Sequence, residues 1–468
     1  MGAAVRGRGM DMTSGSIFRK ILIFALPLVL TNLLQMLYNV ADMIVVGRFS
    51  PVDGAVGAIG CTMSFVNLIN NFIFGLSMGA TVTVAQAIGA GDRQATRRGV
   101  HTSLTMGGIL GLICLGLGQV LCRPMLQLLD TAPEYLAMSE LYCRICFAGL
   151  PFVAILNCAL GIMRAQGDAT RPLIILSGAG VLNVTFNVLF VAGFGMDVDG
   201  VALATMIANI VSAVAALVCL MRDNGACRVC IRELRIHGAT MRKVLGVGVP
   251  SGVQGMLFNV ANMIVQSAVN SFGPATITAA AIATNLEGFI YTTGNAVANA
   301  AMTFTGQNIG ARKYRRLMPI LLNSYLVTLL LAGTVAVVMF ILLEPLAGLY
   351  MNEATQHRDA IFEVLRVAAI YRLLFMPLCG LMECGSLTLR GMGRSALSMI
   401  NSLFGACVLR LVWIYTVFAA FHEEWVLFLN YPVTWTVTAA IQFVCVWWAT
   451  RNLIRRQERT ETKEPDPV

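Results

Sequence analysis

The sequence predicts an all-α membrane protein that crosses the bilayer twelve times, in two pseudo-symmetric six-helix bundles. Three observations predict this fold class: the composition, a series of long apolar segments and an internal duplication. Of the 468 residues, 57% are hydrophobic and only 12% are charged, whereas soluble domains carry roughly twice that charged fraction. The composition therefore disfavours a cytosolic enzyme, a nucleic-acid-binding protein and a secreted module.

The apolar segments are long enough to cross a bilayer, which takes about 20 residues of helix. Most exceed this minimum, so tilted or protruding helices are expected. We predict twelve spans, at residues 18–47, 55–82, 96–121, 136–163, 172–194, 200–221, 244–272, 276–306, 317–343, 361–388, 395–419 and 428–450.

The basic residues support this count. If the N-terminus is cytoplasmic, the inner segments hold 26 of the 33 Lys and Arg residues, the outer segments hold five, and two lie within spans. Membrane proteins usually carry their excess of basic residues on the cytoplasmic side. We therefore expect a multi-pass protein of the cell membrane with both termini in the cytoplasm. No secretory signal is expected, because the first apolar run is too long for one.

Three motifs recur in the same order in the second half, which indicates a duplication. The matched segments are Met36–Val46 with Met256–Gln266 at an offset of 220, Ala85–Ala90 with Gly306–Ala311 at 221, and Met163–Arg171 with Leu389–Ser395 at 226. Six spans per copy make the repeat parallel, a design in which transporters commonly bind substrate where the repeats meet. We predict an N-terminal tail at 1–17, an N-lobe at 18–221, a basic cytoplasmic linker at 222–243, a C-lobe at 244–450 and a cytoplasmic C-terminal tail at 451–468.

A polar stripe runs along the first predicted span and ends at Asp42. Counted back from Asp42, the stripe consists of Asn39, Tyr38, Gln35, Asn32 and Thr31, at spacings of 3, 4, 7, 10 and 11. These spacings place the residues on one helix face. Such a face must meet a cavity or other helices rather than lipid.

Asn183 and Asn187 share a face of the fifth span, and Thr205 lies in the sixth at a similar depth to Asp42. A carboxylate, amide oxygens and a hydroxyl at one depth make a pocket that could hold a proton on Asp42 or a sodium ion on all four residues. The alternative is that the amides only join helices by hydrogen bonds. A charge is rarely needed for that purpose, so Asp42 is the strongest candidate for ion coupling.

Five ionisable residues stand at membrane depth: Asp42, Glu287, Arg372, Glu383 and Arg410. Such residues are functional candidates by default. In the repeat, Asp42 matches Asn262, so the two halves keep their carboxylates at different places. We interpret Glu287, together with Asn262 and Gln307, as part of a substrate cavity. We expect Glu383 to form a structural ion pair with Arg410 or Arg372.

Pro27 and Pro250 occupy matching places in the first and seventh spans. Proline removes a backbone hydrogen bond and bends a helix. Both are candidate hinges, and a static kink is the alternative.

Motifs for other chemistry are missing from the sequence. No G-x-x-x-x-G-K-[ST] motif is present, which disfavours ATP hydrolysis. Gly75–Gly79 fits G-x-S-x-G, but this motif needs a strand-to-helix turn and a histidine partner. The Cys227/Cys230 pair lacks the second pair that a closed zinc site requires. We therefore expect no enzyme activity, no cofactor, and no nucleic-acid or ATP partner.

The chain resembles the multidrug and toxic compound extrusion (MATE) family of transporters over about residues 17–450. The motifs that carry the resemblance, in family order, are Ala25–Arg48 (ALPLVLTNLLQMLYNVADMIVVGR), Val84–Asp92 (VAQAIGAGD), Met163–Asp168 (MRAQGD), Leu182–Phe190 (LNVTFNVLF), Asp199–Thr205 (DGVALAT), Gly248–Gln254 (GVPSGVQ), Gly306–Lys313 (GQNIGARK) and Leu389–Ser395 (LRGMGRS).

The resemblance implies two six-helix lobes in a V that alternate between outward-open and inward-open forms. It also implies an N-lobe cation site at Asp42, Asn183 and Thr205, with Asn187 where many members have Asp. That departure removes one carboxylate and disfavours sodium more than a proton. The first-helix proline of the family, proposed to bend on protonation, corresponds to Pro27.

These inferences together predict a secondary antiporter that exports amphipathic or cationic organic compounds against inward movement of H+ or Na+. One alternative is a flippase for lipid-linked precursors, which would need a basic cavity. Another is a receptor or scaffold that transports nothing.

Overall fold

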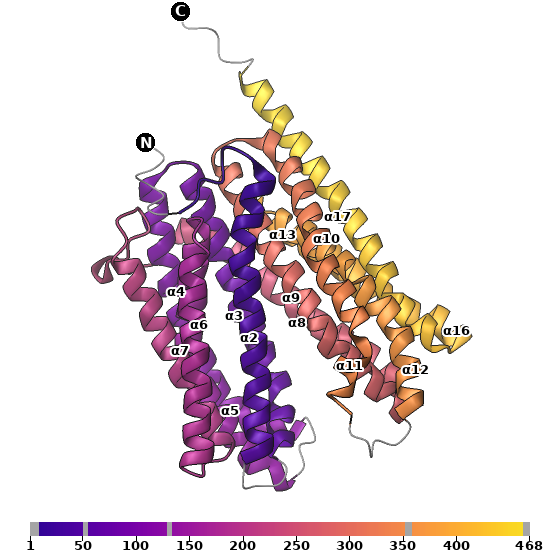
Figure 1. Cartoon of the computed structure of the whole chain (residues 1–468). Helices are drawn as coiled ribbons and strands as arrows, with labels where there is room; N and C mark the ends of the chain where they lie inside the picture. The colour runs from indigo at the N-terminus through magenta and orange to yellow at the C-terminus, as the bar shows by residue number, and fades with distance from the viewer. Residues whose placement is uncertain (1–8, 50–54, 129–132, 352–357, 462–468) are drawn as a thin grey trace, which may run out of the picture. The chain divides into compact units, whose positions relative to one another are not determined.

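The computed structural model describes residues 9–49, 55–128, 133–351 and 358–461. The side chains at 39–65, 68, 128, 133–135 and 461 lie outside this description. Every regular element in the described residues is a helix, as Figure 1 shows. The predicted all-α class is confirmed.

The first half of the chain forms six long helices. They are α2 (Ile17–Phe49), α3 (Ala55–Gly89), α4 (Arg93–Leu128), α5 (Pro133–Ala165), α6 (Thr170–Asn187) and α7 (Val198–Met221), and a π-helical turn, η1 (Val188–Gly193), extends α6. A short 3-10 turn, η2 (Ile231–Glu233), lies in the linker before the second half.

The second half also forms six long helical segments, two of them composite. The simple ones are α8 (Gly238–Asn270), α9 (Pro274–Gly310), α10 (Leu317–Ile341) and α17 (Glu424–Glu461). The composite ones are α12 (Arg358–Ala368), η4 (Ala369–Leu374) and α13 (Met376–Gly391), and then α14 (Ser395–Ser402), η5 (Leu403–Val408), α15 (Leu409–Trp413), η6 (Ile414–Phe418) and α16 (Ala419–Phe421). Two short elements, η3 (Tyr314–Arg316) and α11 (Leu343–Gly348), flank α10.

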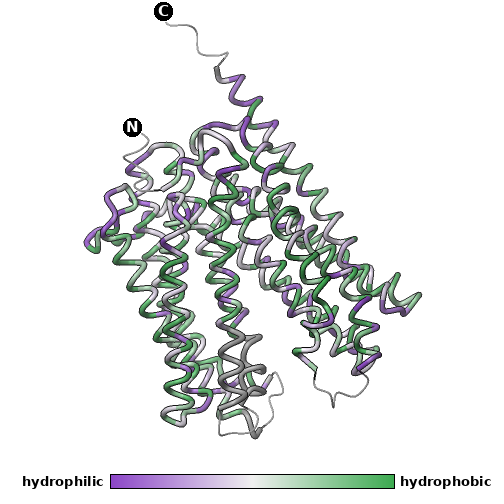
Figure 2. The backbone as a smooth tube through the Cα atoms, in the orientation of Figure 1, coloured by the Kyte–Doolittle hydropathy of each residue, from purple (hydrophilic) through white to green (hydrophobic). Residues whose placement is uncertain are grey.

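Eleven helical segments of the described chain are long and apolar enough to cross a membrane, and each overlaps a predicted span. The remaining predicted span, 276–306, falls in α9, whose 37 residues exceed the required length but include many Thr and Asn residues. Figure 2 shows hydrophobic residues along most of the helices and hydrophilic residues in the linker before α8 and at the end of α17. The chain is a multi-pass membrane protein.

The chain divides into two compact units. Unit 1 comprises Met1–Asp11 and Leu30–Gly255, and unit 2 comprises Met12–Val29 and Met256–Val468. The divisions fall inside α2 and α8, a few residues after Pro27 and Pro250. Each of these two helices therefore belongs partly to one unit and partly to the other.

Small residues set the closest helix contacts in each unit. In unit 1, a Cβ atom on Gly111 of α4 would lie 2.4 Å from the Cα atom of Pro151 in α5. In unit 2, a Cβ atom on Gly294 of α9 would lie 3.1 Å from the Cα atom of Gly380 in α13. Because no larger residue fits at such contacts without a shift, these glycines set the closest approach of α4 to α5 and of α9 to α13.

Candidate functional site

In unit 1, the amides of α6 and the hydroxyl of α7 form a hydrogen-bonded chain. The side-chain nitrogen Nδ2 of Asn183 donates to Oγ1 of Thr205 at 3.1 Å. Asn187 in turn donates through Nδ2 to Oδ1 of Asn183 at 3.3 Å. Both amides are buried, with Asn183 7% exposed and Asn187 fully enclosed. The structure thus brings together Asn183, Asn187 and Thr205, the three neutral residues of the predicted pocket, and their function as an ion site stays a prediction.

The π-helical turn η1 begins directly after Asn187. A π-helical turn interrupts the regular hydrogen-bond ladder, and such turns are frequent at functional sites. This interruption was not expected from the sequence, because its residues are ordinary helix-compatible apolar ones.

The polar stripe of α2 reaches α6 through Tyr38. The Tyr38 hydroxyl donates to the carbonyl oxygen of Ser177 at 3.2 Å. The Tyr38 ring lies over Gly180, where a Cβ atom would approach ring atom Cε2 to 1.7 Å. A larger residue at position 180 would therefore displace the Tyr38 ring, a constraint that the sequence alone did not show. Gln35 is exposed and Thr31 is buried.

Two further residues of the stripe, Asn39 and Asp42, belong to α2, but their side chains lie outside the described residues. The role of Asp42 in ion coupling therefore remains a prediction. The described part of the stripe places α2 against α6, the helix that carries the buried amides.

In unit 2, Glu287 of α9 and Arg372 of η4 form a two-pronged ion pair. Arg372 donates through Nε to Oε2 of Glu287 at 3.0 Å and through Nη2 to Oε1 at 2.7 Å. Its remaining donors reach Oγ1 of Thr284 at 2.9 Å and the carbonyl oxygen of Ala280 at 3.2 Å. The side chains of Arg372 and Glu287 are only 4% and 16% exposed. Glu287, predicted for the substrate cavity, is thus neutralised by a neighbouring helix.

A second buried arginine, Arg410 of α15, lies close by. Its Nη1 donates to Oδ1 of Asn262 in α8 at 2.9 Å, and the residue is 7% exposed. The guanidinium carbons of Arg410 and Arg372 lie 4.9 Å and 5.0 Å from the ring centroid of Tyr431 in α17. Such cation–π contacts hold guanidinium groups in place. Tyr431 was not predicted from the sequence, because aromatic residues are ordinary in membrane helices.

The predicted ion pair of Glu383 with Arg410 or Arg372 is wrong. Arg372 pairs with Glu287, and the described residues contain no ion pair of Glu383. Glu383 and Arg372 lie 11 residues apart on one continuous helical segment, which is about 16 Å along the axis. Glu383 instead experiences the charge of Arg390, two turns further along α13.

Of the three residues predicted for a substrate cavity, only two reach the same region. Asn262 contacts Arg410, whose neighbour Arg372 holds Glu287. Gln307 lies 20 residues after Glu287 in α9, about 30 Å along the helix. It is fully buried among polar neighbours near the end of α9, so it does not join the other two.

The candidate hinges Pro27 and Pro250 lie inside the continuous helices α2 and α8. Neither proline ends its helix. Their movement stays a prediction.

The faces of α8 and α9 beside the arginines of unit 2 are polar and exposed. The exposed polar residues include Asn262, Gln266 and Asn270 on α8, and Thr284, Asn285 and Tyr291 on α9. Spacings of four and four on α8, and of one and six on α9, keep each set near one side of its helix. Exposed amides in membrane-spanning segments indicate a wall that meets water or substrate rather than lipid.

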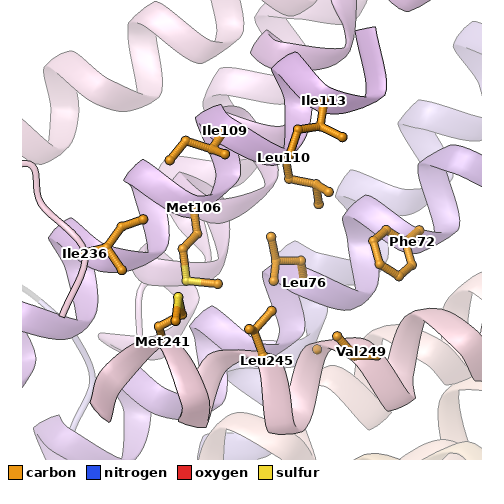
Figure 3. Close-up of a pocket in the computed structure, with 11 residues that line it drawn as sticks. Phe72, Leu76, Met106, Ile109, Leu110, Ile113, Ile236, Met241, Leu245 and Val249 are labelled. Atoms are coloured by element: carbon orange, nitrogen blue, oxygen red, sulfur yellow. The ribbon is translucent and has the colours of Figure 1, made fainter. Parts of the chain in front are cut away.

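Unit 1 also contains an apolar pocket of about 240 Å³. Figure 3 shows side chains of α3, α4 and α8 around it, among them Leu76, Met106 and Met241. Its lining is almost entirely carbon, with two methionines that can adapt to different shapes. The pocket suits the apolar part of an organic compound or a lipid chain.

A duplicated bundle of membrane helices with buried polar and charged clusters in each half has the organisation of a transporter. The MatE family model matches this chain twice, over residues 27–189 and 250–416. The chain belongs to the MATE family of multidrug efflux transporters. The two matches also follow the duplication found in the sequence.

Individual relatives agree with this assignment. The probable multidrug resistance protein YoeA of Bacillus subtilis is 25% identical over 401 residues, which cover 83% of this chain and 84% of that protein. The probable multidrug resistance protein NorM of Thermotoga maritima is 23% identical and covers 84% of both chains. A transporter of the MOP superfamily from Pyrococcus furiosus has a structure that matches with a TM-score of 0.87 at 21% identity, over 95% of this chain and 98% of that one. This structural likeness shows that the fold is shared.

Proposed function

We propose that this protein is a secondary active antiporter that exports amphipathic organic compounds by alternating access. Inward movement of H+ or Na+ drives the export. The observation that carries the proposal is the buried chain of Asn187, Asn183 and Thr205 in unit 1. Buried amides and a hydroxyl at membrane depth are costly unless they serve helix contacts or a ligand. The same unit holds the segment of α2 that carries Asp42.

Asp42 is the coupling residue in this proposal. It holds a cation in one conformation and releases it in the other, so that ion and substrate favour opposite conformations. The carboxylate supplies the charge, and the neighbouring amides and hydroxyl supply neutral oxygens. An ion that bound both conformations equally would drive nothing.

The proposed substrates are amphipathic because the two units offer different surfaces. Unit 1 has an apolar pocket with two methionines, and unit 2 has exposed polar faces on α8 and α9. Cationic members of this set would be attracted by Asp42 rather than by Glu287, because Arg372 already neutralises Glu287.

The proposed location is the cell membrane, with both termini and the linker at 222–243 in the cytoplasm. The support is the distribution of basic residues, 26 of 33 on one side. The N-lobe at 18–221 and the C-lobe at 244–450 would then be the two halves that move.

Efflux of a fluorescent organic cation from proteoliposomes tests the proposal, with a pH step and a sodium step imposed in separate experiments. We expect one of the two gradients to drive efflux by the unaltered chain, and Asp42→Asn to abolish this drive. Asp92→Asn is the matched control, because Asp92 accepts a backbone hydrogen bond from Ala95 at the start of α4, as Asn can too. Full gradient-driven efflux by Asp42→Asn would exclude Asp42 as the coupling residue. Absence of any gradient-driven flux in the unaltered chain would exclude antiport.

A further inference from the structure

The internal repeat relates two polar residues of unit 2, Arg410 and Asn262, to positions in unit 1. The two family matches end 227 residues apart, at 189 and 416, and the third repeated motif has an offset of 226. These offsets align Arg410 with Asn183 or Val184. Thr205 and Tyr431 lie beyond the ends of the two family matches, so the repeat assigns no counterpart to either. At the offset of 220 in the first motif, Asn262 aligns with Asp42.

The aligned residues of unit 2 touch one another. Arg410 donates to Asn262 at 2.9 Å and lies 4.9 Å from the ring centroid of Tyr431. At the aligned positions the charges differ. Unit 1 has an acid, Asp42, where unit 2 has Asn262, and unit 2 has a base, Arg410, where unit 1 has Asn183 or Val184.

Arg410 forms no ion pair within the described part of unit 2. Both carboxylate oxygens of Glu287 accept hydrogen bonds from Arg372. Arg410 has no carboxylate within ion-pair distance among the described residues, and its buried Nε has no acceptor there. An unneutralised guanidinium at membrane depth is expensive, so a fold that retains it implies an anionic partner.

The surroundings of Arg410 allow such a partner to reach it. Asn262 is exposed, and its oxygen accepts from Arg410, which leaves its side-chain NH2 group to donate to a ligand. Two π-helical turns, η5 and η6, flank the five-residue helix α15 that carries Arg410. Interrupted helices of this kind are frequent at functional sites.

We propose that Arg410 and Asn262, with Tyr431 holding the guanidinium in place, bind the carboxylate of a transported organic compound. This inference rests on the proposed function and names the substrate class of the same transporter: amphipathic organic carboxylates, including zwitterions. A guanidinium suits a carboxylate because its planar donors match the two oxygens. The cation of the driving gradient and the anion of the substrate then have separate sites, one in each unit.

The test compares rhodamine B, which carries a carboxylate, with its ethyl ester, in which that group is blocked. Binding to the full chain in phosphatidylcholine nanodiscs is measured by fluorescence anisotropy. We expect Arg410→Gln to weaken binding of rhodamine B by about tenfold or more, the loss of a charge-assisted hydrogen bond, and to change binding of the ester less than twofold. Arg394→Gln is the matched control, since Arg394 also lies over an aromatic ring, that of Trp448. It should change neither affinity.

Three outcomes would overturn the inference. Equal weakening of both dyes by Arg410→Gln would mean a structural role for Arg410, and no weakening of either would mean no role in binding. Displacement of rhodamine B by phosphatidylglycerol in the nanodisc would assign the site to a lipid headgroup. If Arg410→Gln does not fold, Arg410→Lys keeps the charge without the planar fork. We then expect a smaller, carboxylate-specific loss, and an equal effect on both dyes would again contradict the proposal.

Flux measurements separate this inference from the proposed function. The unaltered chain could export the ester and rhodamine B equally well under the gradient, with neither rate changed by Arg410→Gln. That result would support the antiporter and refute the anion site. Failure of both dyes to be exported under either gradient would refute the antiporter, whatever the binding data show.

Discussion

The two units both bury polar groups between membrane helices, but they stabilise them differently. In unit 1, Asn183, Asn187 and Thr205 on α6 and α7 are neutral and are joined by hydrogen bonds. In unit 2, charged side chains come from three helical segments, Glu287 on α9, Arg372 on η4 and Arg410 on α15, and Tyr431 on α17 lies beside both arginines. Two halves with the same series of helices therefore use neutral hydrogen bonds in one case and charged contacts in the other.

This difference matters for energetics as well as for ligands. A neutral hydrogen bond between membrane helices contributes about 1 kcal/mol, whereas a buried ion pair that loses one partner leaves an uncompensated charge. We therefore expect substitutions in the charged cluster of unit 2 to have larger effects on stability than substitutions in the amide chain of unit 1.

The largest effect should come from Glu287→Gln. It leaves the guanidinium of Arg372, which is 4% exposed, without its carboxylate, and breaking a buried pair in this way costs about 3–5 kcal/mol. The double variant Glu287→Gln with Arg372→Met should recover most of the loss, because both charges are then removed. Thermal unfolding of the detergent-solubilised protein, followed by size-exclusion chromatography, measures both.

The exposed pair of Glu344 and Arg366 provides the control for that experiment. Its side chains are 60% and 65% exposed, so Glu344→Gln should cost about 1 kcal/mol or less. Equal losses of stability for Glu287→Gln and Glu344→Gln would show that the buried ion pair of Glu287 and Arg372 stabilises unit 2 no more than an exposed pair does.

A smaller loss of stability is expected from a substitution in α6, at the place where Tyr38 of the polar stripe on α2 contacts it. In Gly180→Ala the new Cβ atom would lie 1.7 Å from the Tyr38 ring, and overpacking of this kind costs about 1–3 kcal/mol. At Gly178, two residues earlier, a Cβ atom meets nothing within 4 Å. Gly178→Ala should therefore be neutral or stabilise the helix by up to about 1 kcal/mol. If the two variants unfold at the same temperature, the contact of Tyr38 with α6 is absent in the membrane.

The most sensitive test of the comparison adds a charge to unit 1. Asn187→Asp places a carboxylate beside Asn183 and Thr205, the oxygen donors that a hard cation prefers. We expect the sodium concentration for half-maximal efflux to fall about tenfold, the size of one charge-assisted interaction. Asn323→Asp on α10 is the control, because the Asn323 amide bonds only to a carbonyl within its own helix. An unchanged sodium dependence would mean that the amide chain of unit 1 joins helices and binds no cation.

Much of the fold was predictable because its signals are local in the sequence. Apolar length predicts a membrane span, basic residues predict the side of each loop, and repeated motifs such as Met36–Val46 and Met256–Gln266 predict two related halves. Spacing on a helix also grouped Asn183 with Asn187, since residues four apart share a face. None of these inferences depends on which helix packs against which.

Which charged residues pair depends on that packing. The sequence analysis predicted these partners wrongly or not at all. Glu287 and Arg372 are 85 residues apart in the chain, so only the packing of α9 against η4 decides that they pair and that Glu383 does not. The approach of Tyr431 to both arginines and the fit of Tyr38 over Gly180 were decided in the same way. The sequence determined by itself that the chain crosses a membrane in two similar halves, because hydropathy and periodicity act along one helix. The tertiary structure alone decided which charges are neutralised, because Coulomb attraction and close packing act across space between helices that the sequence does not order.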